Sequence, residues 1–328
     1  MLNFIHFAHA LGEHPRWKPL RDHHEIAAAL EAPEPAWLHL HAEDPGTRPW
    51  IDENLSYLDP SIRAALTQPE TRPRAVRIGD GLLVILRGIN MDPGEDPEDM
   101  ISVRMWIDPA RIVSLSRRKL ASVMQLDREC GEGKGPKDAG SFLAHLIEQL
   151  TTRIETQIDD LDDRTESLEA AVIGDPNGAQ GAELSDLRLE AIDLRQYMGP
   201  QRDAIRDVLA SGVDWLTEAH RSTLNEQHSR MTRVVEELEA TRDQLQAIRD
   251  ELGRAMDERL NRNLYILSVI SAVFLPLGFL TGLMGINLAG MPGANWPPAF
   301  WVFTASLAVL SAAIVVLLWC LKLVRPRR

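Results

Sequence analysis

Charge is missing from the last part of this chain. Residues 264–321 contain no Asp, Glu, Lys, Arg or His, in a 328-residue sequence that is 25% charged overall. Four of the 35 basic residues follow this segment, so residues 1–263 carry 31 basic against 48 acidic residues, a net charge of −17 compared with −13 for the whole chain. A charged head joined to a charge-free tail excludes a purely soluble protein and a disordered one. The acidic balance argues against nucleic acid as a partner.

Cysteine and the common catalytic motifs are also scarce. The only cysteines are Cys130 in the head and Cys320 in the tail, so no structural disulfide is expected. The sequence has no phosphate-binding loop, no nucleophile elbow and no pair of catalytic acids, so we expect neither an enzyme, nor an ATP-driven pump, nor a resident cofactor. The N-terminus lacks the basic start and the apolar core of a signal peptide, which predicts a cytoplasmic head.

The tail consists of two apolar runs, Leu264–Met284 and Ala299–Leu321. Each is long enough to cross a bilayer, which takes about 20 residues; two buried helices of a soluble core are the alternative. The connecting segment Gly285–Pro298 is rich in Gly and Pro and has no basic residue, whereas Arg259, Arg262 and the basic tail 322–328 flank the other side. The positive-inside rule then predicts a multi-pass protein of the inner membrane with both termini in the cytoplasm.

The head is predicted to be an α/β domain over residues 1–140. Short apolar runs between turn residues indicate strands, and longer amphipathic runs indicate helices. The strands are expected at Trp37–Leu40, Leu82–Ile89, Met100–Ile107 and Arg111–Leu115, and the helices at Arg21–Glu31 and Ser61–Leu66. Gly131–Gly140 is the expected linker to a helical stalk over residues 141–263.

Three helices are expected in the stalk. The first covers Ser141–Ile173, the second Glu183–Ala210 with a kink or break near Gly199-Pro200, and the third starts near Glu218. The third has apolar residues at a strict spacing of seven, namely Leu224, Met231, Leu238, Leu245 and Leu252. Such a seam needs a partner helix, either in the same chain or in another copy.

Two spans from one chain cannot enclose an aqueous path, so a transport function requires several copies. The first span is the better candidate for lining a pore, because small and polar residues recur along one face. That face carries Asn261, Leu264, Leu267 or Ser268, Ser271, Leu275, Gly278 and Gly282. A plain helix–helix contact face is the alternative.

The first span ends at Gly285-Ile286-Asn287. A Gly-x-Asn at the outer end of the first of two C-terminal spans resembles the CorA superfamily of divalent-cation transporters. The central Ile286, the segment Glu70–Arg74 and the stretch from Leu86 to Met100 are more similar to the ZntB zinc-transporter branch than to the magnesium branch. The resemblance implies a CorA-like funnel, a homopentamer in the lipid membrane, in which five Asn287 side chains surround the outer mouth.

A ring of carboxamides binds a metal ion through its water shell, because Asn carries hydrogen-bonding groups but no net charge. The only metal-stripping side chain within residues 264–321 is Cys320, at the wrong end, so the ion is expected to enter hydrated. Such a site treats Zn²⁺, Mg²⁺, Co²⁺ and Ni²⁺ alike, and the zinc preference comes from the resemblance. Proton coupling, if present, would be carried by groups at the inner mouth such as Asp257 or Glu258, or by the water of the ion itself. A magnesium/cobalt transporter and a membrane-anchored sensor or scaffold remain alternatives.

Two further groups could bind a metal in the head. His39 and His41 are two residues apart on an expected strand and therefore share a face. Asp159 and Asp163 belong to an acidic run on the first stalk helix. The alternatives are scattered surface histidines and a solvated helix face.

Overall fold

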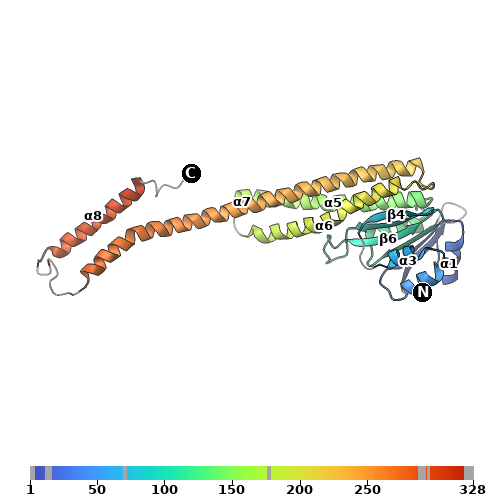
Figure 1. Cartoon of the computed structure of the whole chain (residues 1–328), viewed down its shortest axis with the longest axis horizontal. Coiled ribbons are helices and arrows are strands. Elements are labelled where there is room, and N and C mark those ends of the chain that lie inside the picture. The colour runs from blue at the N-terminus through green and yellow to red at the C-terminus, as the bar shows by residue number, and fades with distance from the viewer. Residues whose placement is uncertain are drawn as a thin grey trace. The chain divides into compact units, whose positions relative to one another are not determined.

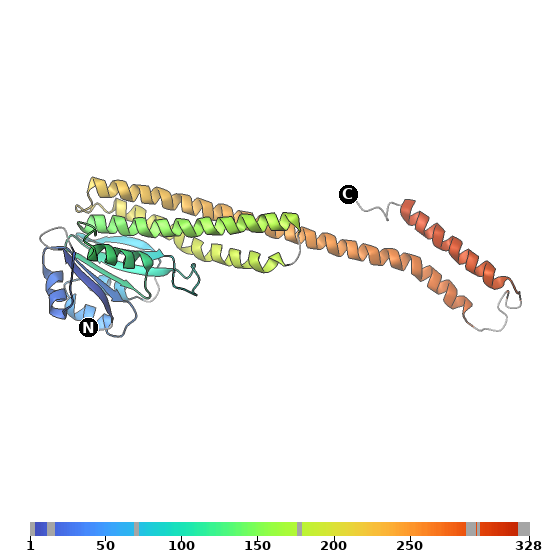
Figure 2. The ribbon, with the colours of Figure 1, turned by 180° about the vertical axis from the view of Figure 1, so that it is seen from behind.

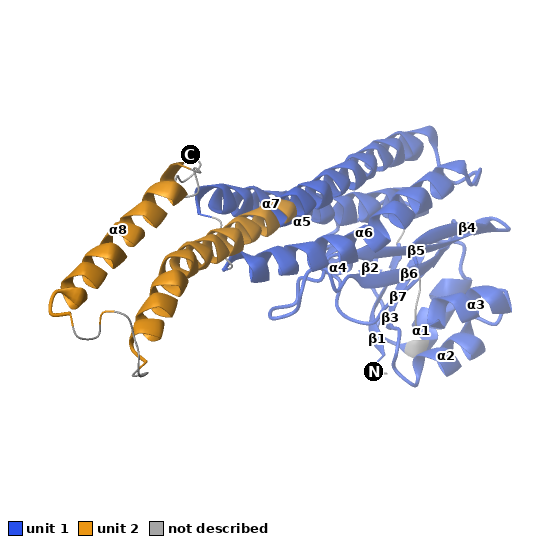
Figure 3. Cartoon of the chain, turned by 60° about the vertical axis from the view of Figure 1, so that its left-hand side comes forward, with its two compact units in different colours: residues 1–175, 179–249 blue, residues 176–178, 250–328 orange. Residues whose placement is uncertain are grey.

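The computed structural model describes residues 4–11, 17–68, 72–175, 179–286, 293 and 296–320. These form two compact units (Figure 3). The first comprises Met1–Asp175 and Ala179–Arg249, and the second comprises 176–178 and Asp250–Arg328.

The first unit is built on a mixed seven-stranded sheet with the order β2-β1-β3-β7-β6-β5-β4. The central pair β3–β7 is parallel and every other neighbouring pair is antiparallel. Four of the strands were predicted within one or two residues, and β1, β2 and β4 were not. The strands are β1 (Ile5–Leu11), β2 (Trp17–Pro19), β3 (Ala36–His41), β4 (Arg74–Ile78), β5 (Gly81–Gly88), β6 (Ile101–Ile107) and β7 (Arg111–Ser116).

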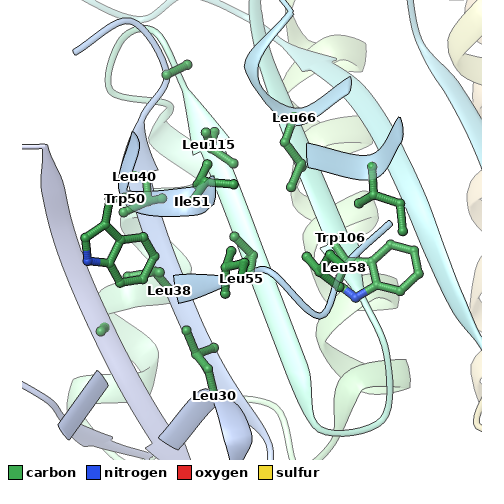
Figure 4. Close-up of a cluster of buried hydrophobic side chains, with 14 of the residues drawn as sticks. Leu30, Leu38, Leu40, Trp50, Ile51, Leu55, Leu58, Leu66, Trp106 and Leu115 are labelled. Carbon is green, nitrogen blue, oxygen red and sulfur yellow. The ribbon is translucent and has the colours of Figure 1, made fainter. Parts of the chain in front are cut away.

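Three short helices cover one face of the sheet: α1 (His23–Glu31), α2 (Thr47–Asn54) and α3 (Pro60–Thr67). Figure 4 shows their apolar side chains packed on the strands, with Leu38, Leu40 and Leu115 on the sheet side and Ile51 and Leu55 on the helix side. All five are fully buried. Because side chains alternate along a strand, the intervening residues Trp37 and His39 point to the opposite face.

The opposite face packs against α4 (Ala121–Gly131), α5 (Ala139–Gly174) and α6 (Gln180–Ala210). The rings of Trp37 and Phe142 meet edge to face with centroids 4.8 Å apart, and both side chains are buried. The predicted linker is short, since α4 ends at Gly131, α5 begins at Ala139, and both helices belong to the same unit. Asp138 and Ser141 form a capping box that fixes the start of α5.

Helix α7 (Glu218–Met284) begins in this unit and lies beside α5 and α6 there (Figures 1 and 2). The heptad residues Leu224, Met231, Leu238 and Leu245 are at most 1% exposed within the single chain. Polar contacts reinforce this packing: Arg230 pairs with Glu155, and Thr241 donates to Asp162 across 3.1 Å. The heptad seam of α7 therefore packs within its own chain, which was one of the two partners expected from the sequence.

Helix α6 runs through Gly199-Pro200 as one helix, so of the kink or break expected there it has no break. Proline removes one helix hydrogen bond, but the residue that follows ties α6 to the sheet. The Gln201 amide accepts from the Arg87 backbone N–H at 2.7 Å and donates to the Arg87 carbonyl at 2.8 Å. This pair of bonds holds the helix in place where the proline would otherwise weaken it.

The second unit contains the end of α7 and the helix α8 (Ala299–Cys320). Both have a segment long and apolar enough to cross a membrane, and none of either segment is buried within the chain. Large side chains such as Leu275 (74% exposed), Phe279 (67%) and Trp301 (72%) face outward. Apolar surface on this scale is stable only against lipid or other protein.

The contact between the sheet and α5 leads to a prediction. Phe142→Ala removes a ring packed against Trp37 and is expected to cost about 3–5 kcal/mol of folding stability. Phe142→Leu should cost less than half of that, because it keeps most of the apolar volume. Thermal unfolding of the detergent-solubilised protein measures both changes. Leu189→Ala, at a residue 59% exposed, is the control and should leave the transition unchanged; an equal shift for this variant would contradict the assignment.

Candidate functional site

The small and polar face predicted for the first span is one continuous stripe on α7. At about 100° per residue, the stripe residues fall within an arc of about 120°. All of them are exposed in the single chain: Asn261, Leu264, Leu267, Ser268, Ser271, Leu275, Gly278 and Gly282. The stripe is therefore open to water or to another copy of the chain.

The outer half of this stripe allows another helix to approach closely. Gly278 and Gly282 are one turn apart, and a Cβ atom at either would meet nothing within 4 Å. Glycines at this spacing let helix backbones pack together in a membrane. Ser268 donates its hydroxyl to the Leu264 carbonyl at 2.8 Å, so its polar group is satisfied within the helix. Pore lining and helix contact both remain compatible with the stripe.

The Gly-x-Asn motif directly follows α7. The Gly285 N–H donates to the carbonyls of Thr281 at 2.9 Å and Gly282 at 3.1 Å, which closes the last turn of the helix. Ile286 is 46% exposed. Asn287, the residue expected to contact the ion, lies outside the described residues.

Asp257 extends the stripe at its inner end, which sequence reasoning left open. It precedes Asn261 by four residues and falls within the same arc of α7. Glu258 is turned about 100° away, and Arg259 and Arg262 fall on the opposite side of the helix. Residues 257–262 thus carry two acids and two arginines, which cancel in number but not by face. Of these four charges, the one aligned with the stripe is the negative charge of Asp257.

His39 is a buried structural histidine in this fold. It is 1% exposed, and both ring nitrogens have partners: Nδ1 contacts the Ser114 hydroxyl at 2.9 Å and Nε2 contacts the Ser116 hydroxyl at 3.1 Å. Ser116 donates its own hydrogen to the Arg118 carbonyl, so the neutral ring with its proton on Nε2 satisfies every group. Burial, followed by the charges of His6 and His41, lowers the pKa of His39 to about 3.

His41 shares the face of His39, as its spacing predicted, and a third imidazole joins them. The register between β1 and β3 shifts between Ile5 and Phe7, and this bulge brings His6 to the same side. The His6 ring centroid lies 5.5 Å from that of His39 and 5.7 Å from that of His41. Burial, followed by the charge of His41, lowers the pKa of His6. A metal shared by His39 and His41 stays a prediction, and it would require His39 to give up a serine contact.

Asp159 and Asp163 lie exposed on α5, four residues apart. Other acids of the same run hold α7 instead, since Glu155 pairs with Arg230 and Glu169 accepts from Gln244 at 2.6 Å. Within the described part of the chain, no three His, Cys, Asp or Glu side chains come together as a metal site. A cation at Asp159 and Asp163 also stays a prediction.

Comparison with known proteins places the whole chain among transporters. The model of the family described as CorA-like Mg²⁺ transporter protein matches residues 34–322. The divalent cation transporter CmaX of Pseudomonas aeruginosa is 36% identical over 271 residues, which is 82% of this chain and 81% of that protein. The zinc transport protein ZntB of Pectobacterium atrosepticum is 34% identical over 293 residues, 89% of this chain and 88% of that protein.

Solved structures share the same fold. The full-length CmaX protein matches with a TM-score of 0.82 and 32% identity over 96% of this chain and 98% of that one. The CorA magnesium transporter of Methanocaldococcus jannaschii matches with a TM-score of 0.79 and 16% identity over 97% of this chain and 98% of that one. The predicted architecture, an α/β head followed by a long helix and two C-terminal apolar helices, is confirmed.

The depressed pKa of His39 predicts a pH-dependent stability. The unfolded chain takes up a proton near pH 6.5, whereas the folded protein resists protonation down to about pH 3. Stability is therefore fully present above pH 6.5 and falls as the pH drops, by about 2 kcal/mol between pH 6.5 and pH 5. His39→Gln should flatten this dependence in thermal unfolding measured from pH 7.5 to 5. His24→Gln, at an exposed residue of α1, is the control, and an unchanged pH profile for His39→Gln would contradict the account.

Proposed function

Because the chain belongs to the CorA-like family of Mg²⁺ transporter proteins, and is thus a divalent-cation transporter rather than an enzyme, we propose that its cargo is Zn²⁺. The ion passes in hydrated form along the stripe of α7, in a homopentamer embedded in the inner membrane with both termini in the cytoplasm. The family expected from Gly285-Ile286-Asn287 is the family found. The zinc assignment is supported by the ZntB relatives and by Ile286 in the motif.

One observation carries the mechanism: the charge-free segment offers a dication almost none of the side chains that strip a metal of its water. Within residues 264–321 no carboxylate or imidazole is present, and the only thiol is Cys320. Hydroxyls such as that of Ser268 already bond to their own helix. A hydrated ion needs only hydrogen-bonding groups at the mouth and a path wide enough for its shell, and Asn287 supplies the former.

The exposed stripe supports assembly. A single chain leaves the face of Leu264, Ser271 and Gly278 open, and two spans cannot surround an ion. Several copies arranged around an axis place these faces toward a common centre, while the more uniformly apolar α8 remains against lipid. Five copies are proposed from the resemblance to the CorA superfamily.

Because the ion stays hydrated on this path, the uptake rates of Zn²⁺, Mg²⁺ and Co²⁺ have to be compared directly to identify the cargo. The ring of Asn287 side chains contacts water rather than metal, so the pore chemistry does not separate Zn²⁺ from Mg²⁺ or Co²⁺. Uptake into proteoliposomes loaded with a metal-sensitive dye, with each metal and with or without a pH gradient, ranks the cargo and tests proton coupling. Faster uptake of Mg²⁺ and Co²⁺ than of Zn²⁺ would favour the magnesium/cobalt alternative, and no uptake of any of them would favour a membrane anchor.

Asn287→Ala is expected to abolish uptake while leaving assembly intact, because it removes the carboxamide that holds the water shell. Asn263→Ala is the matched control, since Asn263 is on the same helix but about 40° outside the arc of the stripe. Uptake assays and size-exclusion chromatography separate transport from assembly. Undiminished uptake by Asn287→Ala, or equal loss in both variants, would contradict the assignment.

Asp257→Asn is expected to reduce uptake several-fold at low salt, because copies of Asp257 around the axis form a negative ring that concentrates cations at the inner mouth. The effect should shrink toward 0.5 M salt as screening increases. Glu258→Gln, which removes the same charge one residue away and outside the arc, is the control. Equal effects from both variants would show that net charge, rather than the aligned face, sets the rate.

A further inference from the structure

The sheet of the first unit ends in a polar cavity that the transport pathway does not use. Strands β3, β5 and β7 end, and β6 begins, at the same edge, because β3 and β7 are parallel and β5, β6 and β7 alternate in direction. At this edge lies a cavity of about 880 Å³, whose lining includes the ends of all four strands and one turn of α6. The carboxyl edge of strands in an α/β domain is a common ligand site, and the volume suits a small molecule.

Part of the lining of this cavity is basic. Arg87 at the end of β5 and Arg117 and Arg118 just after β7 line it. Arg104 lies two residues beyond the lining residue Ser102 on β6, is 1% exposed, and donates to the Leu66 carbonyl. Burial, followed by the charges of Arg117 and Arg87, lowers the pKa of Arg104 to about 10. Guanidinium groups thus gather at one point of an otherwise acidic head.

Two of these arginines, Arg117 and Arg118, are positioned to exchange their present partners for a ligand. Arg87 is held in place: its guanidinium stacks on the Tyr197 ring at 3.9 Å and donates to the Met100 carbonyl at 2.7 Å. Arg117 pairs with Glu43 at 2.7 Å and Arg118 with Glu95 at 2.6 Å, and these side chains are 42–50% exposed. Ion pairs at such exposure contribute little to stability, so a ligand with stronger acceptors can displace them.

The same cavity is also lined by acids. They include Glu98 and Asp99 from the segment between β5 and β6 and Asp193 from α6. Burial, together with the negative charges of Glu190, Asp96 and Asp193, raises the pKa of Glu98. A cavity lined by both arginines and carboxylates matches a ligand that carries an anionic group together with a cation.

We propose that this cavity binds a phosphate-bearing metabolite as its Mg²⁺ complex. The phosphate oxygens accept hydrogen bonds from Arg87, Arg117 and Arg118, whose planar groups match phosphate geometry. The hydrated metal faces Glu98, Asp99 and Asp193, as Mg²⁺ keeps several waters and is held through carboxylates plus phosphates. The site lies entirely within the first unit and does not depend on which cation crosses the membrane.

Isothermal titration of the full-length protein in detergent tests this site with four probes: Mg·ATP, ATP with EDTA, Mg²⁺ with pyrophosphate, and Mg²⁺ alone. Saturable binding of Mg·ATP is expected. Its affinity should fall about tenfold or more in the double variant Arg117→Gln/Arg118→Gln, because each substitution removes charge-assisted hydrogen bonds. Equal binding of Mg²⁺ with pyrophosphate would assign recognition to the phosphates. Arg202→Gln/Arg206→Gln on α6 is the matched control, because it removes two arginines that pair with Asp203 and Asp207 outside the cavity.

Circular dichroism checks that the double variants fold, and Arg117→Lys/Arg118→Lys should retain part of the affinity by keeping the charge. The proposal is overturned if none of the phosphate probes binds, if both double variants bind equally, or if Mg²⁺ alone gives the same isotherm. Binding of ATP with EDTA as tight as that of Mg·ATP would overturn the role assigned to Glu98, Asp99 and Asp193.

Discussion

The lack of metal ligands in the membrane segment is the constraint on which the transport account depends. A dication loses its water only to carboxylates, imidazoles, thiolates or other strong donors, and residues 264–321 offer a single thiol. On the proposed path the ion therefore keeps its shell, which requires a route that is wide, uncharged and lined by small or weakly polar groups. The stripe from Asn261 to Gly282 has this character, and the two glycines at its outer end leave room rather than provide binding.

Residues outside the membrane segment anchor α7 and carry the charges that the membrane segment lacks. Helix α7 is anchored in the head by burial of its heptad residues beside α5 and α6, and it continues as one helix to Met284. Charge is concentrated outside the span, and Asp257 shares the arc of the stripe whereas Arg259 and Arg262 do not. Attraction of cations and their passage thus involve different residues of the same helix. The arginine-lined cavity in the head adds a separate place where the proposed ligand can act.

Local patterns were enough to predict most of the elements and the family. The heptad spacing in α7, the charge-free spans and the short apolar runs of β3 and β5–β7 each give a strong local signal. Strands β1, β2 and β4 were not predicted. The two edge strands among them give a weak pattern, because β2 is three residues long and β4 is mostly exposed. The uninterrupted course of α6 through Pro200 depends on Gln201 bonding to Arg87, 114 residues away. In the same way, His39 is satisfied by serines of β7, more than 70 residues along the chain. Contacts of this range leave no local signal in a sequence.

Passage of a hydrated ion is the central claim, and competition by an exchange-inert complex tests it most directly. Hexaamminecobalt(III) has the size of a hydrated cation and cannot release its ligands. In proteoliposomes, it should inhibit Zn²⁺ uptake by occupying the mouth, and it should bind the wild-type protein but not Asn287→Ala. Zn²⁺ uptake that continues undisturbed at saturating complex, in a protein that otherwise depends on Asn287, would show that the site holds a dehydrated metal and would contradict the account.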